Sequence, residues 1–527
     1  MGWARTTCLR TLGLRPFLFW KYAILAVVSA LYLYPFVRSF SGSADYGVFL
    51  NGADLLNHGA IPSRDFVEPQ GPGSFVWLAL FFRLFGTTLA TARAVLTATG
   101  VGTGLLAFYL SRTLGATGLF GALFVVVISV PLLPINSPHY DSNLFALAAL
   151  AVFLAAWNEA AKGEPPASWK LVLAAVLCGL TTWMIQQKGY CLAVALLISL
   201  LWLMRRKAFR PAMIFAGCFA VVALSPFVFF TAVHALPDVL FANYLWPLRS
   251  YSELNQSPYG FPAWRDFRWS IERHANHPIG WIGDFAFTFA IPFLLVALLP
   301  LLLPLAARLS GPRWFTAPIL PYWLAAYALW IAELQRIDIG HLRNGVVIMV
   351  VLFFSICEVG TNKYLRRAGF GFAISLVFAG AINFRMSLEN DRKQETRRGA
   401  IYVEEDEPLL GFLDTHTHAG DEVFVYPYQP IYYFFEQLKN PTRYSYLLYH
   451  LQSNAQFAEA VGDLDRKNVR YVIFDSVLSG QRISEIFPAY RQPGKAKLIM
   501  EPYLDARYRL AFDLGRFHVL ERRDDAH

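Results

Sequence analysis

The chain has 527 residues and a formal net charge of +9, with 56% hydrophobic, 16% aromatic and only 16% charged residues. Soluble domains carry about 25% charged residues, so this composition excludes a cytosolic enzyme, a disordered chain and a disulfide scaffold. It predicts a polytopic membrane protein in which aromatic rings anchor at both membrane interfaces. In such a protein the net positive charge indicates Lys and Arg on cytoplasmic loops, not a nucleic-acid partner.

Eleven apolar segments are candidates to cross the membrane. A helix needs about 20 apolar residues to span a bilayer, and some of these segments reach that length only with their flanks. No A-x-A-like cleavage site follows the first segment, so we expect a retained helix and not a signal peptide. The segments are Phe17–Val37, Leu89–Leu110, Leu119–Leu133, Leu144–Trp157, Leu171–Ile185, Tyr190–Met204, Met213–Val233, Phe285–Ala307, Phe315–Ile331, Val346–Cys357 and Phe370–Phe384.

The charges on the connections predict the orientation. Every second connection is rich in Lys and Arg, whereas the short connections between them carry only Lys188 and Arg336. The positive-inside rule therefore predicts a cytoplasmic N-terminus, and an odd number of spans puts the C-terminus outside. The outer side then holds the loops 38–88 and 234–284 and everything after Met386.

Residues 387–527 differ in composition from the apolar part, 1–386, and we expect them to form a separate domain. Strand-like runs at Glu422–Tyr426, Tyr471–Phe474 and Phe517–Leu520 alternate with helical patterns such as Ala455–Leu464. This alternation predicts a small extracytoplasmic α/β domain. The chain has no Walker A motif and no GxGxxG, so nucleotide binding has no support.

The first outer loop places an acid close to the membrane. Asp45 follows the first span, and apolar residues at helical spacing after it predict an amphipathic helix in the membrane interface. Arg64 and Glu68 lie in the polar run that follows this helix. A lone acid after a span is commonly a solvated loop residue, but Asp45 is fixed between a span and a helix.

Later outer connections add further polar groups. Asp141 ends the short turn 134–141, so we expect it at the membrane surface. Lys188 forms a lone cation in the turn Gln186-Gln187-Lys188-Gly189, either snorkelling or meeting an anionic headgroup. Asp338 and His341 are three residues apart and would share a helix face. Two alternatives are equally good: the pair forms part of a binding site, or the two are interfacial polar residues with satisfied hydrogen bonds.

The order of these features resembles the GT-C superfamily of polytopic glycosyltransferases. The resemblance covers most of the chain at low identity and is greatest to the bacterial branch similar to dolichyl-phosphate-mannose–protein mannosyltransferases and lipid A aminoarabinose transferases. It rests on the acids Asp45 and Asp141 and on the runs HGAIPSRDFVEPQGPGSF, QQKG, RIDIGH, YLWPLRSYSELNQSPYG and VFVYPYQPIYYFF.

The resemblance implies roles for individual residues. Asp45 stands at the position of the general base and Asp141 at that of a second loop acid. The cations for the donor phosphate would be Lys188, Arg64 and Arg336, and the groups that bind donor or acceptor would be Glu68, His139, Tyr140, Asp338 and His341. Relatives often carry Glu-Lys-Pro where this chain has Glu68-Pro69-Gln70, so a lysine that could hold phosphate is missing here.

The implied reaction is inverting transfer of a sugar from a polyprenyl-phosphate donor to a glycan, lipid or protein acceptor, at the outer face of the bacterial inner membrane. No cofactor is expected, although a divalent cation, Mg²⁺ or Mn²⁺, stays open as an alternative to a metal-free site. The main alternative function is a transporter or flippase of lipid-linked sugars. Transporters carry polar residues inside their spans, whereas these spans are nearly free of charge, which favours chemistry at the surface.

Overall fold

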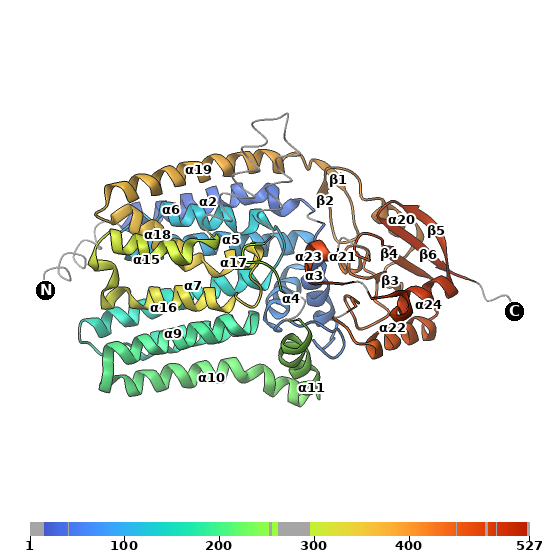
Figure 1. Ribbon diagram of the computed structural model, residues 1–527, viewed down its shortest axis with the longest axis horizontal. Helices are drawn as coiled ribbons and strands as arrows, with labels where there is room; N and C mark the ends of the chain where they lie inside the picture. The colour runs from blue at the N-terminus through green and yellow to red at the C-terminus, as the bar shows by residue number, and fades with distance from the viewer. Residues whose placement is uncertain are drawn as a thin grey trace.

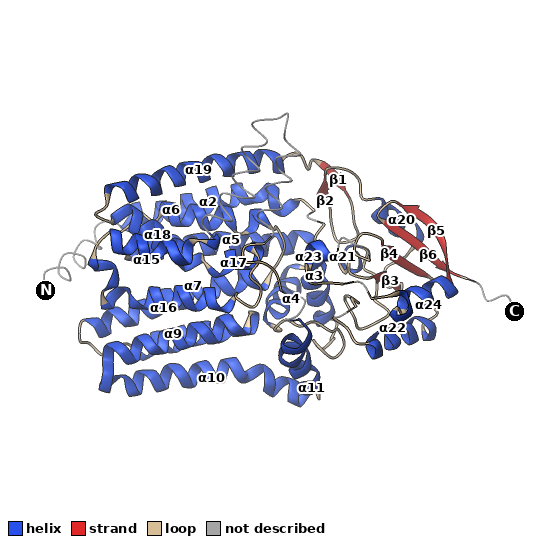
Figure 2. Ribbon diagram, viewed as in Figure 1, coloured by secondary structure: helices blue, strands red, loops and turns tan. Residues whose placement is uncertain are grey.

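The computed structural model describes residues 15–40, 42–251, 256–261, 296–449, 451–479, 483–491 and 493–523. Residues 285–295 of the predicted eighth segment, and residues 252–255 and 262–284 of the second outer loop, lie outside this part of the chain. Long helices lie side by side in one bundle, and the four-stranded sheet lies beyond one end of it (Figure 1). Figure 2 shows that the strands are confined to the half of the molecule that contains the C-terminus.

Helices occupy the apolar segments that the sequence predicts, within the described residues. Six are long and apolar enough to cross a membrane, and a seventh span is formed if α17 and α18, bent by 64°, act together. The six are α2 (Arg15–Arg38), α5 (Leu89–Thr113), α7 (Pro138–Ala161), α9 (Gln186–Met204), α10 (Phe209–Ala232) and α19 (Lys363–Ser387). The bent pair is α17 (Ile339–Gly345) and α18 (Val347–Val359). The predicted number of eleven spans and the predicted orientation stay predictions.

Shorter helices complete the bundle and the end of it that faces the sheet. The bundle contains α6 (Leu119–Ile128), α8 (Ser168–Met184), α15 (Leu299–Leu309) and α16 (Leu320–Ala332). The end that faces the sheet contains α3 (Ala44–Asn57), α4 (Gly73–Phe85) and α11 (Leu236–Leu240). Single 3-10 or π-helical turns lie at Val130–Leu132, Arg205–Ala208, Phe241–Leu245, Pro247–Tyr251, Pro312–Phe315 and Ala317–Ile319.

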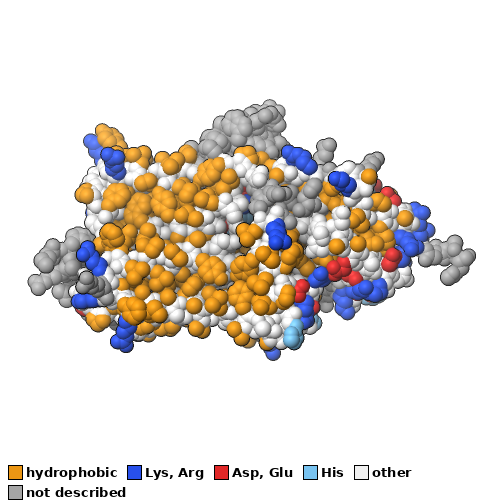
Figure 3. Space-filling view, turned by 60° about the horizontal axis from the view of Figure 1, so that its bottom comes forward, with side chains coloured by type: hydrophobic (Ala, Val, Ile, Leu, Met, Phe, Trp, Pro, Cys, Tyr) orange, Lys and Arg blue, Asp and Glu red, His pale blue; other side chains and the backbone are white. Residues whose placement is uncertain are grey.

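The surface of the bundle is that of an integral membrane protein. Hydrophobic side chains cover a broad band over the bundle, while Lys and Arg gather towards its ends and on the C-terminal part (Figure 3). Val221, Val228 and Leu301 are each more than 70% exposed, which is favourable in lipid and unfavourable in water. Helix α2 begins at the end of the bundle remote from the sheet (Figure 1).

The C-terminal part folds as the predicted α/β domain. Its main sheet has the order β3 (Val423–Tyr426), β4 (Tyr471–Asp475), β6 (Phe517–Arg522) and β5 (Tyr508–Leu514). The pair β3–β4 is parallel and the other two pairs are antiparallel. The three predicted strands and the predicted helix are confirmed; β5 was not predicted. The other elements are β1 (Arg392–Gln394), β2 (Ile401–Val403), α20 (Pro408–His416), α21 (Ile431–Phe435), α22 (Asn454–Arg466), α23 (Ile483–Ile486), the 3-10 turn Lys495–Lys497 and α24 (Met500–Arg507).

The helix predicted after Asp45 is present as α3, but its apolar face does not lie open to the membrane. Residues Tyr46–Ala53 are all buried, and α4 and α21 pack on the helix. A Cβ at Gly47 would lie 2.0 Å from the backbone nitrogen of Ile431, so only glycine permits this close approach. The expectation of an interfacial helix is therefore corrected, because the C-terminal domain covers the surface that sequence alone assigns to lipid.

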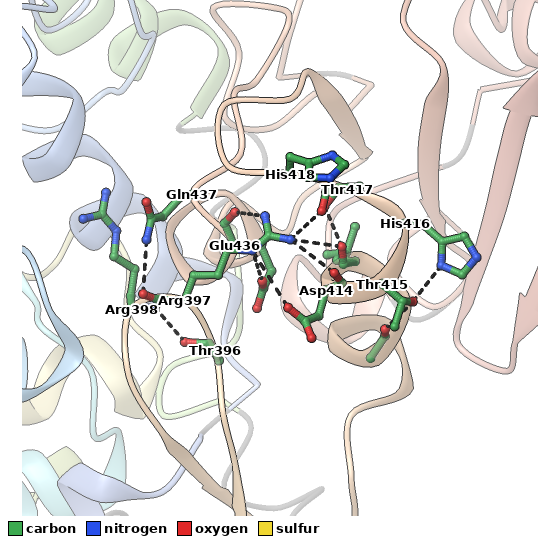
Figure 4. Close-up of polar contacts among 12 residues, drawn as sticks. Thr396, Arg397, Arg398, Asp414, Thr415, His416, Thr417, His418, Glu436 and Gln437 are labelled. Atoms are coloured by element: carbon green, nitrogen blue, oxygen red, sulfur yellow. Dashed lines mark hydrogen bonds and ion pairs between the residues drawn. The ribbon is translucent and has the colours of Figure 1, made fainter.

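Two neighbouring arginines tie the C-terminal domain together and to the bundle. Arg397 donates to the carbonyl oxygens of Thr417 (2.6 Å) and Glu436 (2.8 Å), within the domain. Arg398 instead forms an ion pair with Asp54 of α3, with 2.7 Å between Nη2 and Oδ2. Figure 4 shows the two side chains pointing in opposite directions. The domain therefore has a defined position on the end of the bundle that contains α3.

Candidate functional site

A cavity of about 590 Å³ lies where the C-terminal domain meets the end of the bundle. The bundle side is formed by the start of α3, residues 68–70, the start of α7 and helix α17. The C-terminal domain contributes the opposite side, including Tyr428, Gln429, Tyr446 and Arg516. The cavity contains several groups that the sequence predicts as a site: Asp45, Glu68, His139, Tyr140, Arg336, Asp338 and His341.

Asp45 lies in the first turn of α3 and lines the cavity. The hydroxyl group of Tyr428 donates a short hydrogen bond to its Oδ1 atom. Burial, and then the charge of Asp45, raise the pKa of Tyr428 well above its usual range, so the phenol stays a donor. The contact holds one carboxylate oxygen of Asp45 and leaves the other available for a ligand.

Glu68 lines the cavity close to Asp45 and is only 2% exposed. Its segment is fixed to the C-terminal domain, because the Val67 backbone nitrogen donates to the Arg443 carbonyl at 2.8 Å. Burial, and more weakly the charge of Asp45, raise the pKa of Glu68 to about 8, against a lowering hydrogen bond from Ser445. A group with this pKa is mostly protonated at neutral pH.

Two histidines line the cavity, each with a carboxylate on its Nδ1 atom. His139 Nδ1 lies 3.0 Å from Glu333, and His341 Nδ1 lies 2.9 Å from Asp338. Their ring centroids are 5.1 Å apart. Burial would raise the pKa of Asp338, but His341 and Arg336 outweigh that effect and hold it well below its usual range. A carboxylate on Nδ1 fixes the orientation of an imidazole.

Arg343 lines the same cavity and was missed by sequence reasoning. It is 5% exposed, and it donates to the Tyr140 hydroxyl (3.0 Å) and to the Gly340 carbonyl (3.2 Å). Among the described residues no carboxylate lies within 4 Å of its guanidinium. Arg343 precedes an apolar span on the side that the positive-inside rule predicts to be outer, where Lys and Arg are scarce, and that feature of the sequence could have identified it.

Three of the predicted site residues do not line the cavity. Arg64 lies on the surface, paired with Asp65 at 2.8 Å. Asp141 is buried in the first turn of α7, close to Ser74 and Thr99. Its expected position at the membrane surface stays a prediction.

Lys188 is not a lone cation at the surface, and that prediction is wrong. The run 186–189 forms the first turn of α9, and the Lys188 side chain is 0% exposed. Its Nζ atom lies 2.8 Å from Glu333 Oε1 and 2.9 Å from Asn143 Oδ1. Glu333 therefore contacts both Lys188 and His139. Lys188 does not line the cavity, and Glu333 connects it to the cavity residue His139.

No group of three or more His, Cys, Asp or Glu residues in the described part of the chain is placed to hold a metal ion. Asp338 is paired with His341, and His139 is paired with Glu333. A divalent cation stays an untested prediction.

No protein-family model matches the sequence, and no curated protein matches it. Solved structures do share its fold. The oligosaccharyltransferase of Archaeoglobus fulgidus, in complex with zinc and sulfate, is similar with a TM-score of 0.52 and 12% identity, over 94% of this chain and 73% of that chain. ArnT from Cupriavidus metallidurans bound to undecaprenyl phosphate is similar with a TM-score of 0.54 and 11% identity, over 96% and 98%. The chain thus shares the fold of these two proteins.

Proposed function

We propose that this protein is an inverting glycosyltransferase that moves a sugar from a polyprenyl-phosphate carrier to a glycan, lipid or protein acceptor. The observation that carries the proposal is that one cavity holds both a carboxylate, Asp45, and a buried guanidinium without a carboxylate partner, Arg343. A buried charge without a counter-ion is costly, so such a group is suited to receive an anionic ligand. The GT-C fold supports this choice, as does the undecaprenyl phosphate bound to ArnT.

In the proposed reaction Asp45 is the general base. An acceptor hydroxyl attacks the anomeric carbon, and the bond from that carbon to the phosphate oxygen breaks. The hydroxyl proton passes to Asp45 as the new glycosidic bond forms, and the electron pair leaves on the polyprenyl phosphate. A carboxylate within about 3 Å of the hydroxyl contributes about 10²–10⁴-fold to such a step. The Tyr428 hydrogen bond keeps Asp45 in one orientation for it.

The leaving phosphate gains negative charge, which Arg343 is placed to balance. Arg336 adds positive potential in the same cavity. Preorganised donors of this kind act strongly in a site from which water is excluded. We propose Lys188 and Asp141 as buried supporting groups and not as groups that touch the donor. Arg64 lies outside the proposed donor site.

The cavity would open at the outer face of the bacterial inner membrane. The Lys- and Arg-rich connections support this placement through the positive-inside rule. The polyprenyl chain would lie along the apolar bundle, with its phosphate at the cavity.

The test compares wild type with Asp45→Asn in proteoliposomes that contain a panel of radiolabelled polyprenyl-phosphate hexoses and pentoses. Asn keeps the size of the side chain but cannot accept the proton, so transfer should fall by about a hundredfold or more with undecaprenyl phosphate binding intact. Asp65→Asn, which removes an acid outside the cavity, is the matched control and should transfer normally. Equal transfer by Asp45→Asn would refute Asp45 as the base. Movement of labelled lipid across the bilayer without transfer would instead support the flippase alternative.

A further inference from the structure

Two polar side chains of the C-terminal domain line the cavity with atoms that make no hydrogen bond within the described part of the chain. They are Gln429 and Arg516, and both lie on the side of the cavity opposite the bundle. Gln429 is only 2% exposed, yet neither atom of its amide has a described partner and both keep accessible surface. Because the rest of this residue is buried and it lines the cavity, the amide can meet a molecule that enters the cavity.

Arg516 is held in place through one edge of its guanidinium group. It lies in the turn between β5 and β6, and its Nε and Nη2 atoms donate to Asp475 at 3.1 and 2.6 Å. Asp475 is 0% exposed, and its Oδ1 atom also accepts from the backbone nitrogens of Val477 and Leu478. The Nη1 atom of Arg516 has no partner among the described residues and keeps accessible surface. The buried carboxylate thus fixes the guanidinium and leaves its other end free to donate.

The charge on this side of the cavity favours an uncharged ligand. Of the described residues that the C-terminal domain contributes to the cavity, Arg516 alone is a Lys, Arg, Asp or Glu, and Asp475 balances its charge. The Gln429 amide offers one acceptor and two N–H donors, and Arg516 adds further donors. A sugar hydroxyl both donates and accepts, so it can pair with the amide in either sense and can accept from the guanidinium.

Aromatic rings and the proposed base lie beside these two groups. Tyr428, which precedes Gln429, and Tyr446 both line the cavity and are partly exposed, with ring centroids 5.1 Å apart. An aromatic ring gives an apolar surface on which the C–H face of a sugar can pack. The Tyr428 hydroxyl donates to Asp45, so a sugar bound at Gln429 lies next to the residue that contacts the proposed base.

We propose that Gln429 and Arg516 form the acceptor subsite, and that the acceptor is an uncharged glycan whose hydroxyl groups form hydrogen bonds with both side chains. One hydroxyl of the bound sugar is then directed towards Asp45, while the donor phosphate stays on the bundle side with Arg343. This proposal deepens the glycosyltransferase function and rests on it for the transfer step. Binding of a glycan at this subsite does not depend on transfer, so the two can fail separately.

The first test measures binding without transfer. Fluorescently labelled protein in detergent micelles is applied to an array that carries neutral bacterial oligosaccharides, acidic oligosaccharides and peptides. Wild type should bind neutral oligosaccharides, and Gln429→Met and Arg516→Lys should each bind the best of them about three- to tenfold more weakly, as expected for one lost hydrogen bond. Met keeps the length of Gln without its polar atoms, and Lys keeps the ion pair with Asp475 but has no second nitrogen for a ligand.

The matched control is Arg470→Lys, because Arg470 pairs with Glu521 at 3.0 Å in the same domain and does not line the cavity. This variant should bind as wild type does. Three results would overturn the proposal: wild type binds no neutral oligosaccharide, wild type binds only peptides or acidic oligosaccharides, or both cavity variants bind as tightly as the control.

The second test separates the two substrates, with the donor found active in the panel above and the oligosaccharide bound best on the array as acceptor. Gln429→Met and Arg516→Lys should each raise the KM for the acceptor about three- to tenfold and leave the KM for the donor unchanged. Their affinity for undecaprenyl phosphate should also match wild type. Weaker binding of undecaprenyl phosphate by Arg516→Lys would assign the arginine to the donor and overturn the proposal. If both variants weaken glycan binding but even wild type transfers no sugar, the glycosyltransferase function fails and the glycan subsite stands.

Discussion

The ion pair between Lys188 and Glu333 provides a quantitative test of the buried polar network. The two side chains are 0% and 1% exposed, with 2.8 Å between Nζ and Oε1. Removing one partner of such a pair leaves an uncompensated buried charge and costs about 3–5 kcal/mol. Lys188→Met should therefore lower the free energy of unfolding by about this amount, or roughly two to three and a half powers of ten in the folding equilibrium.

The double variant Lys188→Met/Glu333→Met removes both charges. It should be more stable than Lys188→Met alone and lie about 1–3 kcal/mol below wild type, because His139 then lacks the acceptor for its Nδ1 atom. Equilibrium unfolding of the purified protein in mixed micelles with increasing SDS, followed by Trp fluorescence, measures the free energy of unfolding of the single and the double variant. The exposed Lys162→Met is the control and should change stability by about 0.5 kcal/mol or less. A Lys188→Met protein as stable as this control, or a double variant no better than the single one, would refute the reasoning.

Three further variants test other parts of the site. Gly47→Ala forces a Cβ into the backbone of α21, so it should lower the free energy of unfolding by about 1–3 kcal/mol and make the C-terminal domain sensitive to protease. Gly217→Ala, which has open space around it, is the control and should have neither effect. Arg343→Gln should weaken binding of undecaprenyl phosphate about 10- to 100-fold in a direct binding assay, while Arg64→Gln binds normally; equal affinities would remove the phosphate role. Tyr428→Phe should lower kcat about three- to tenfold without changing KM, and a change confined to KM would contradict its role in orienting the base.

The helices were predictable because hydrophobic length and periodicity are properties of local sequence. The same pattern does not show which helix face meets another part of the chain. Consecutive residues on a helix are turned by about 100°, so His139 faces the cavity whereas Asp141, two residues on, faces Ser74. Sequence reasoning that treated the run 134–141 as one surface turn could not separate them.

The sequence also does not predict ion pairs between residues that lie far apart in the chain. Lys188 and Glu333 are 145 residues apart, and neither the charge nor the spacing of one indicates the other. Hydrophobic segments flank the run 186–189, so the sequence alone predicts that Lys188 is an isolated cation. Asp45 and Glu68, in contrast, lie in one outer loop near the first span, and the structure brings both to the cavity.

The C-terminal domain belongs to the proposed site, because neither part of the molecule encloses the cavity alone. The bundle supplies Asp45 and Arg343, and the C-terminal domain supplies Tyr428, which donates to Asp45, the proposed base. In the proposed reaction the lipid-linked donor approaches from the membrane, and a glycan or protein acceptor approaches from water. A cavity between an apolar bundle and a water-exposed domain lets both reach one carboxylate, and the ion pair from Arg398 to α3 fixes the two walls relative to each other.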